Sequence, residues 1–517
     1  MSDQIGLTPA LLDVNLLPAL LIVVPILAAT LPLALGLRFE RTGWSVALAT
    51  CIGLFAATLT VAREVFVDGQ VSVVHEVGGY PAPHGIELVA DEFSTMIALL
   101  VTGTALGVLA YTRIGGPRGS TFYAGYLLLT GGLLGLTFTG DVFNMFVFLE
   151  IVGLATYGLI AKGDSAESAV AGLKYLILGT LGASLYLLGV GLLFMATGSL
   201  NMQHLATDYL QVADPEYNET LVRASFAFIF VGFAIKVAQW PLHTWQPDAY
   251  QHAPDGVTPL IAALVSTVSA YALGRILFTV YGVDFVTTTP FVQEIILAVG
   301  VTSVMAGSIL AVLQRDVKRM FAYSSVSQFG LIVAAYGLAT PLALIGAIVH
   351  LVGHGLMKAG LFLGVGVVAA STGARRVRGY AGLADRRPVA AASIAVLGIS
   401  LIGIPPSIGF IGKWYIAVGA VQAEVWAVAA VIFLSTMLTL LYVARLLEAM
   451  YFTPTSHIES PHPTDLATDG GVDGTTVSLG MVGIIVGAAL LAVGLGFAGE
   501  PFYDALEPFV DEVMSND

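Results

Sequence analysis

The sequence predicts an all-α polytopic membrane protein with about 14 transmembrane helices. Of its 517 residues, 57% are hydrophobic and only 11% are charged, a composition typical of membrane proteins rather than of soluble multidomain ones. Most apolar runs reach the length of about 20 residues that a bilayer span requires. Many connections between them are too short to fold alone. These observations predict a single membrane domain over residues 1–517.

The predicted spans follow one another along the whole chain. They lie near residues 11–36, 44–62, 88–112, 122–139, 141–161, 168–197, 222–250, 256–282, 289–313, 320–338, 340–371, 388–415, 424–450 and 476–498. The longest polar segments between them are 63–87, 198–221 and 452–475. The last of these is rich in Asp, Pro, Ser and Thr, which predicts a flexible loop.

Lysine and arginine are distributed unevenly over the loops on the two sides. If the N-terminus faces out, the inside loops hold 14 of the 21 basic residues, and the outside loops hold two, Arg63 and Arg223. Basic residues favour the cytoplasmic side of short loops. We therefore expect both termini outside and the loop 375–387 inside.

The net charge of −14 is unusual for a membrane protein. An acidic, lysine-poor exterior favours a high-salt organism, so we expect the plasma membrane of a prokaryotic halophile. The single cysteine, Cys51, excludes an internal disulfide and a thiol-held iron–sulfur or zinc site within this chain. The chain has no phosphate-binding loop, so ATP is not the expected driver, and we expect no cofactor.

Four of the six lysines lie inside apolar runs. The most informative is Lys236, in ASFAFIFVGFAIKVAQWPLHTWQPDAYQHAP, because an ammonium near the middle of a membrane helix costs roughly 2.5–3.5 kcal/mol. Pro241 should kink or break the helix just after it. Broken helices at bilayer depth are tolerated where they line protein or water, as in ion pathways. The alternative is a lysine that snorkels to an interface.

Other titratable residues lie at similar depth. Glu150 is buried in TGDVFNMFVFLEIVGLATYGL, where pairing with Lys236 would let its protonation switch as the pair opens and closes; a purely structural ion pair is the alternative. Lys413 follows the prolines of LIGIPPSIGFIGKWYIAVG, and an interfacial lysine is again the alternative. Lys174, near the end of a span, either snorkels or modulates Glu150.

His350, His354 and Lys358 are spaced four residues apart in HLVGHGLMKAGLF, which places them on one helix face. Imidazole titrates near neutral pH and suits a proton relay. Histidines at i and i+4 can also bind zinc, but no carboxylate or thiol lies close in sequence, so we expect no metal. A purely structural histidine pair is the other alternative.

These segments resemble the proton-translocating antiporter family shared by Mrp-type Na⁺/H⁺ antiporters and complex I membrane subunits. The family has a lysine followed by Pro-Phe/Leu-His-x-Trp-x-Pro-Asp-Ala and then Ala-Pro. The residues that match this pattern are Lys236, Pro241, His243, Trp245, Pro247, Asp248, Ala249, Ala253 and Pro254. The family patterns around Glu150, His350 to Lys358 and Lys413 match as well, as does DVKRMFAYSSVSQFG, whose Ser327 and neighbours should line the path.

The resemblance implies two inverted five-helix repeats with a broken helix in each. It places N-terminal helices at 1–121, the repeats at 122–282 and 289–450, and a loop and C-terminal helix at 451–517. The implied proton path consists of Glu150, Lys236, His350, His354, Lys358 and Lys413, supported by Lys174, His243, Thr267 and Ser327. Thr267 is a departure, because the family usually has lysine there, and a hydroxyl orients water but stores no charge.

The resemblance implies a proton-conducting subunit within a multi-subunit membrane complex, a transporter rather than an enzyme. Lys413 and the chain length favour a D-type subunit of an Mrp-like Na⁺/H⁺ antiporter. The alternatives are an antiporter-like subunit of a complex I-type NADH/quinone dehydrogenase, or a membrane subunit of a related hydrogenase or inorganic-carbon uptake complex. The expected partners are other membrane subunits, protons, Na⁺ and the bilayer, with no nucleic acid.

Overall fold

The computed structural model describes residues 13–39, 42–163, 165–211, 220–454 and 477–514. Within these ranges, 12 helices are long and apolar enough to cross a membrane. Two of the 14 predicted spans, 222–250 and 388–415, are missing from that count because each is divided into two shorter helices. The predicted flexible loop at 452–475 falls almost entirely outside the described residues.

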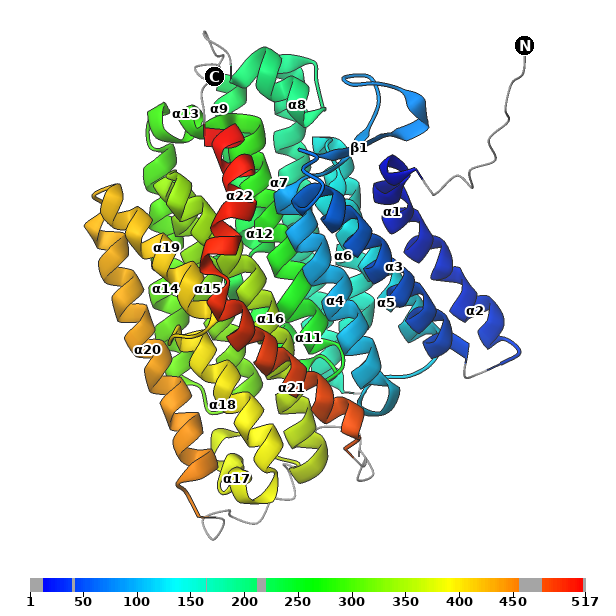
Figure 1. Ribbon diagram of the computed structural model, residues 1–517, viewed down its shortest axis with the longest axis vertical. Helices are drawn as coiled ribbons and strands as arrows, with labels where there is room; N and C mark the ends of the chain where they lie inside the picture. Colours follow the sequence, from blue (N-terminus) through cyan, green and yellow to red (C-terminus); the bar gives the residue numbers. More distant parts are fainter. Residues whose placement is uncertain (1–12, 40–41, 164, 212–219, 455–476, 515–517) are drawn as a thin grey trace.

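The N-terminal region forms one flank of the molecule (Figure 1). It contains α1 (Leu17–Ala28), α2 (Thr30–Gly36), α3 (Thr42–Phe66) and α4 (Glu92–Gly115). Between α3 and α4 the polar segment folds into an antiparallel hairpin of β1 (Val73–Glu76) and β2 (Glu87–Ala90). The prediction of an all-α membrane protein did not include this two-stranded hairpin, which β-branched Val73 and Val74 and the pairing of backbone groups favour.

The next helices form the first half of the bundle. They are α5 (Ser120–Phe138), α6 (Val142–Ile160), α7 (Ala166–Thr197), the short α8 (Met202–Leu205), α9 (Thr220–Lys236) and α10 (Trp245–His252). Asp141 caps the N-terminus of α6, accepting a hydrogen bond of 2.6 Å from the Asn144 backbone N–H. Helices α7 and α9 pack along most of their length, with Gly182 and Gly232 allowing close backbone approach.

The centre of the molecule is a long span from Thr258 to Thr288, which is buried along most of its length and becomes exposed at Thr287 and Thr288. It is built from α11 (Thr258–Leu260), α12 (Ser266–Arg275) and α13 (Gly282–Thr288), joined by π-helical turns at Ile261–Val265 and Ile276–Tyr281. Single π turns inside α-helices are frequent at functional sites. This span separates the first half of the bundle from the second.

The second half begins with α14 (Val292–Leu313), α15 (Val317–Leu338) and α16 (Pro341–Thr372). It continues with α17 (Leu383–Arg386), α18 (Pro388–Ile402), α19 (Ile408–Gln422) and α20 (Trp426–Tyr451). Helices α15 and α16 are deeply buried, whereas α20 exposes a broad apolar face that suits lipid or a partner subunit.

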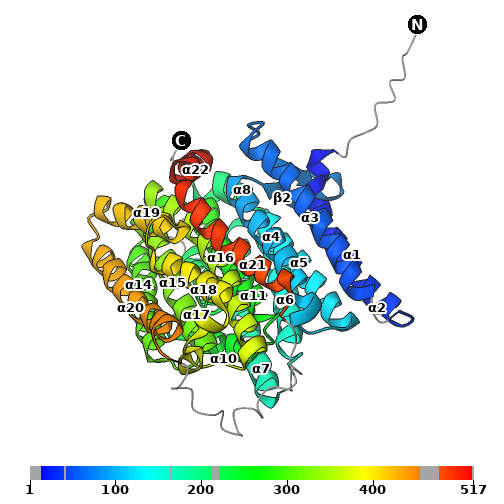
Figure 2. The same cartoon turned by 60° about the horizontal axis from the view of Figure 1, so that its bottom comes forward.

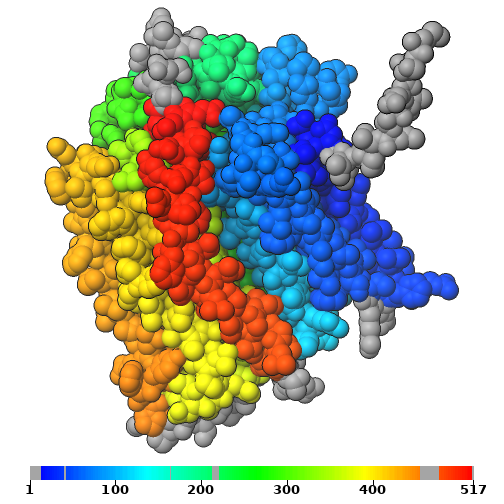
Figure 3. All heavy atoms as spheres, viewed as in Figure 1, coloured from blue at the N-terminus to red at the C-terminus, as the bar shows by residue number. Residues whose placement is uncertain are grey.

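The chain ends with α21 (Leu479–Gly494) and α22 (Gly499–Met514). Figure 3 shows them as a continuous band across the front of the molecule, between the N-terminal helices and α18–α20. Helix α22 and the start of α1 lie at the same end as the hairpin, which we call the hairpin end, and α17 lies at the opposite, α17 end (Figures 1 and 2).

Candidate functional site

The first broken helix places Lys236 at a helix terminus. Helix α9 ends at Lys236, as predicted from Pro241, and helical structure resumes with a 3-10 turn at Leu242–Thr244. The Trp245 indole N–H donates to the backbone oxygen of Ile235 at 2.8 Å, which satisfies a carbonyl that the break exposes. The free carbonyl end of a helix favours a cation. The break therefore holds the buried ammonium where the helix dipole stabilises it.

Lys236 and Glu150 line the same small cavity between α6, α7 and α9, of about 10 Å³, room for roughly one water molecule. Two glycines open the space around the ammonium: a Cβ on Gly153 would lie 3.5 Å from Lys236 Nζ, and one on Gly179 3.8 Å from it. Among the ion pairs of the described residues, none joins Lys236 to Glu150. Lys236 is buried and Glu150 is half-buried.

Lys174 does not contact Glu150. Its Nζ lies 2.6 Å from Asp248 Oδ2 on α10, and Arg319 on α15 binds the other oxygen of Asp248 at 2.9 Å. Lys174 is thus part of an ion-pair triad that joins α7, α10 and α15. His243, in the 3-10 turn, is buried against Tyr323 with ring centroids 5.9 Å apart, and its Nδ1 has no hydrogen-bond partner among protein atoms.

Thr267 occupies the predicted central position on α12. It is fully buried, and its hydroxyl has no partner among protein atoms. The same holds for both polar atoms of the Gln239 side chain, in the break after α9. Buried polar groups almost always have a partner, protein or water. These groups therefore mark positions that suit ordered water.

The three predicted relay residues of α16 are all buried on one side of that helix. His350 Nε2 pairs with Gln328 Oε1 at 2.8 Å. Lys358 donates to the backbone oxygen of Phe321 at 2.7 Å and to the Ser324 hydroxyl. His354 lies between them, its ring against Phe329 at 4.7 Å, and neither of its nitrogens has a protein partner.

Ser327 does not contact these relay residues. Its hydroxyl pairs with Ser308 of α14 at 2.7 Å, where Gly307 and other small residues let α14 and α15 pack closely. The α15 side chains that hold the relay are instead Ser324 and Gln328, which sequence reasoning grouped with Ser327 without separating their faces.

The second broken helix holds Lys413. Helix α18 ends at Ile402 and α19 begins at Ile408. Lys413 Nζ donates to the backbone oxygens of Leu401 and Ile402, both at 3.0 Å. Both buried lysines thus lie at the carbonyl end of a half-helix. Lys236 is the last residue of α9, whereas Lys413 lies on α19 and contacts the carbonyl end of α18. A Cβ on Gly412 would lie 2.7 Å from His350 Cβ, so α19 approaches α16 beside the relay.

Ion pairs at the helix ends frame this interior. Asp255, between α10 and α11, accepts two hydrogen bonds from Arg375, of 3.0 and 3.1 Å, and one from Lys318 of 3.2 Å. Burial alone raises the pKa of the Asp255 carboxyl, but Lys318 and Arg375 outweigh this and hold that pKa well below its usual range. At the hairpin end, Arg275 pairs with Asp91 at 2.6 Å.

The buried carboxyl, imidazole and amine side chains can each hold and release a proton. Both halves of the bundle hold buried or half-buried titratable groups, Glu150 and Lys236 in the first and His350, His354, Lys358 and Lys413 in the second, where a charge is costly unless it is compensated. Lys236 lies at a helix end, and Lys358 and Lys413 donate to backbone or hydroxyl oxygens, so none of these three ammonium groups is held by a fixed carboxylate partner. Hydroxyl and amide groups between them can orient water.

Known proteins resemble this chain along most of its length. A family model described as NADH:quinone oxidoreductase/Mrp antiporter, TM, matches residues 139–439. The N-type subunit of NADH-quinone oxidoreductase from Desulforudis audaxviator is 40% identical over 461 residues, which are 86% of this chain and 89% of the relative. The D-type subunit of the Na(+)/H(+) antiporter from Bacillus subtilis is 30% identical over 453 residues, 87% of this chain and 89% of the relative.

Among solved structures, a chain of the Mrp complex from Dietzia sp. DQ12-45-1b superposes with a TM-score of 0.84 at 25% identity, covering 97% of this chain and 99% of that one. The family match and the helical membrane fold agree with one another. The chain belongs to the NADH:quinone oxidoreductase/Mrp antiporter family and is an antiporter-like membrane subunit.

Proposed function

We infer that this chain is the proton-conducting subunit of a multi-subunit Mrp-type Na⁺/H⁺ antiporter. The observation that carries the inference is Lys236, held at the end of a broken helix in a cavity shared with Glu150. The likeness to a D-type antiporter subunit and to a chain of the Mrp complex over nearly the whole length supports the choice of complex.

The proposed path has two halves that correspond to inverted repeats at residues 122–282 and 289–450. In the first half, Glu150 and Lys236 exchange a proton through the cavity water. In the second half, His354, His350 and Lys358 carry it along α16, and Lys413 forms the far end. Lys174 acts on the first half through Asp248, and His243 and Thr267 orient water between the halves.

A second candidate is the antiporter-like subunit of a complex I-type dehydrogenase. The 40% identity to the N-type subunit from Desulforudis audaxviator, higher than that to the D-type subunit from Bacillus subtilis, favours it. The proton path would be the same, but the driving force would come from electron transfer in partner subunits. A related hydrogenase or inorganic-carbon uptake complex would use the chain in the same way.

The composition of the purified complex distinguishes these candidates. We expect a tagged chain extracted in mild detergent to copurify with other membrane subunits that lack iron–sulfur clusters. Copurification of iron–sulfur subunits with NADH–quinone activity would instead establish the second candidate.

Transport itself is tested with Lys236→Ala, which should abolish cation/proton exchange in inside-out vesicles while leaving the complex assembled. The matched control is Lys162→Ala, which removes an exposed ammonium. Near-normal exchange in Lys236→Ala would rule out Lys236 as a proton carrier.

A further inference from the structure

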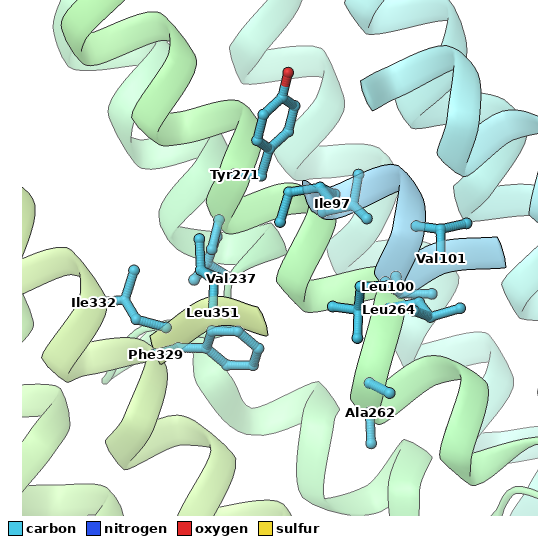
Figure 4. Packing of buried hydrophobic residues seen from close by; sticks show 14 of the residues in the cluster. Ile97, Leu100, Val101, Val237, Ala262, Leu264, Tyr271, Phe329, Ile332 and Leu351 are labelled. Carbon is cyan, nitrogen blue, oxygen red and sulfur yellow. The ribbon is translucent and has the colours of Figure 1, made fainter. Parts of the chain in front are cut away.

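A groove of about 470 Å³ lies between α14 and α20, near the α17 end. It is lined by Val312 of α14 and by Leu441, Tyr442, Ala444, Arg445 and Glu448 of α20. Figure 1 shows α20 at the outer edge of the second half, beside α14. In the interior, by contrast, buried apolar side chains such as Leu264 and Phe329 pack against neighbouring helices (Figure 4). The groove therefore offers room for a small organic ligand at the outer surface of the bundle.

Arg445 links the two helices that form the groove. Its Nη1 donates to the backbone oxygen of Val312 at 2.8 Å, and its Nη2 donates to that of Gln314, at the end of α14. Its Nε has no hydrogen-bond partner among protein atoms. Among the ion pairs of the described residues, none includes Arg445. The guanidinium is therefore fixed in position by uncharged carbonyl groups, and its positive charge is not neutralised by a carboxylate.

Glu448 supplies a negative charge beside this positive one. It lies three residues after Arg445, so the two side chains share a face of α20, with Cβ atoms about 5–6 Å apart. The Glu448 side chain is exposed, and none of the ion pairs found in the described part of the chain includes it. The groove thus presents one cation and one anion side by side, and their sum is zero. This pattern complements a ligand that carries both charges.

Exposed apolar side chains continue the groove away from the α17 end. On α14, exposed Ile309 lies three residues before Val312. On α20, exposed Met437 lies four residues before Leu441. These spacings place each pair on one helix face. Contiguous exposed apolar surface marks a site of contact with a membrane or a protein. The charged pair therefore lies at the end of an apolar track, as a phospholipid headgroup lies at the end of its acyl chains.

We propose that this groove binds one phospholipid with an ethanolamine headgroup. The phosphate lies against the Arg445 guanidinium, the headgroup ammonium donates to the Glu448 carboxylate, and an acyl chain follows Met437 and Ile309. A glycerol headgroup offers Glu448 no positive charge, and a choline headgroup has no N–H to donate to it. This inference does not rest on the proposed function, because no residue of the proposed proton path lines the groove.

Mass spectrometry of the intact complex under non-denaturing conditions tests the site. The complex is extracted in mild detergent and equilibrated with equimolar dioleoyl phosphatidylethanolamine, phosphatidylcholine and phosphatidylglycerol. The wild type should retain the ethanolamine lipid several-fold over the other two. Leu441→Trp, which fills the groove with an indole, should reduce this retention several-fold. Leu434→Trp is the matched control, because Leu434 is exposed on the same helix and does not line the groove. Equal retention in the two variants, or a wild-type preference for phosphatidylglycerol, would overturn the proposal.

The headgroup contact is tested by Glu448→Gln, which keeps the size of the side chain and removes its charge. The preference for the ethanolamine lipid over phosphatidylglycerol should disappear in this variant. It should persist in Glu294→Gln, which removes an exposed carboxylate from the opposite end of α14. An unchanged preference in Glu448→Gln would refute the assigned ammonium contact and with it the proposal.

A photoreactive amino acid at position 441 identifies the occupant of the groove in native membranes. We expect it to crosslink to phospholipid. Crosslinking to a partner subunit, or to another segment of this chain, would show that protein covers the groove and would overturn the proposal.

Discussion

Lys174 Nζ on α7 lies 2.6 Å from Asp248 Oδ2 on α10, a contact between residues 74 positions apart in the chain. Arg319 on α15 binds the other carboxylate oxygen and also the side chain of Gln251. Asp248 therefore joins the first half of the bundle to the second, next to the broken helix that carries Lys236. A substitution of Asp248 should therefore break an ion pair in each half of the bundle.

Asp248→Asn should slow exchange by about tenfold, which corresponds to ~1.4 kcal/mol of barrier. The asparagine amide no longer neutralises Lys174, so this ammonium competes with Lys236 for Glu150. The initial rate of exchange in vesicles measures the effect. Asp208→Asn, which removes a carboxylate paired with His204 near the hairpin end, should retain the wild-type rate. An Asp248→Asn variant with full activity would show that the triad is only structural.

The rate of exchange should also depend on the free space around the Lys236 ammonium. Gly153→Ala places a methyl group 3.5 Å from Nζ, in ordinary contact, so the helix should still fold while the cavity loses its room for water. We expect slower exchange with normal assembly. Gly158→Ala is the matched control, since it lies on the same helix and its added methyl meets nothing within 4 Å. Equal rates in the two variants would show that cavity water is not required.

The sequence was sufficient to predict the helices that cross the membrane and both broken ones, because apolar length and proline act locally. It could not predict the π-helical turns around α12, which depend on packing against several helices at once. The hairpin was missed because its strands are four residues each, too short for a clear alternation.

For the site as well, the sequence predicts what depends on local spacing but not what depends on how the helices pack. His350, His354 and Lys358 were placed on one face by their spacing alone, since the helix period fixes it. The period could not decide between Ser327 and Gln328, because they lie three and four residues after Ser324 and each shares a face with it. Which of them meets α16 and which meets α14 depends on how the helices pack. Likewise, nothing local to Lys174 indicates its pairing with Asp248.

Asp255→Asn should destabilise the complex by about 3 kcal/mol, because it leaves Lys318 and Arg375 without their shared carboxylate. The depressed pKa of Asp255 means that its contribution is fully present above the unfolded aspartate value of about 3.9, and is lost only as pH falls below it. The stability difference from wild type should thus be equal at pH 6 and pH 8. Thermal unfolding in detergent measures it, with exposed Asp385→Asn as the control. A difference that varies between pH 6 and pH 8 would contradict this assignment.

The orientation in the membrane follows from the basic residues near the α17 end. In a Cys51→Ser background, a cysteine at position 376 should react with a membrane-impermeant reagent only from the inside, and His84→Cys, in the hairpin loop, only from the outside. Both positions are exposed. Labelling of position 376 from the outside alone would reverse the predicted topology, with both termini then inside.

The last prediction concerns the hydroxyl of Thr267. This group is fully buried without a protein partner, so its hydrogen bond, worth roughly 0.5–1.5 kcal/mol, is available to the water that must join the two halves. Thr267→Val keeps the shape of the side chain and removes that hydrogen bond, so exchange should slow while assembly is unchanged. Thr130→Val is the matched control, because the Thr130 hydroxyl bonds to the backbone oxygen of Tyr126 within its own helix. The rates should be compared with that of Lys236→Ala, which we expect to be inactive, in the same vesicles. If Thr267→Val and Thr130→Val exchange at the same rate, the proton does not pass Thr267, and each half of the protein works alone or is joined by another route.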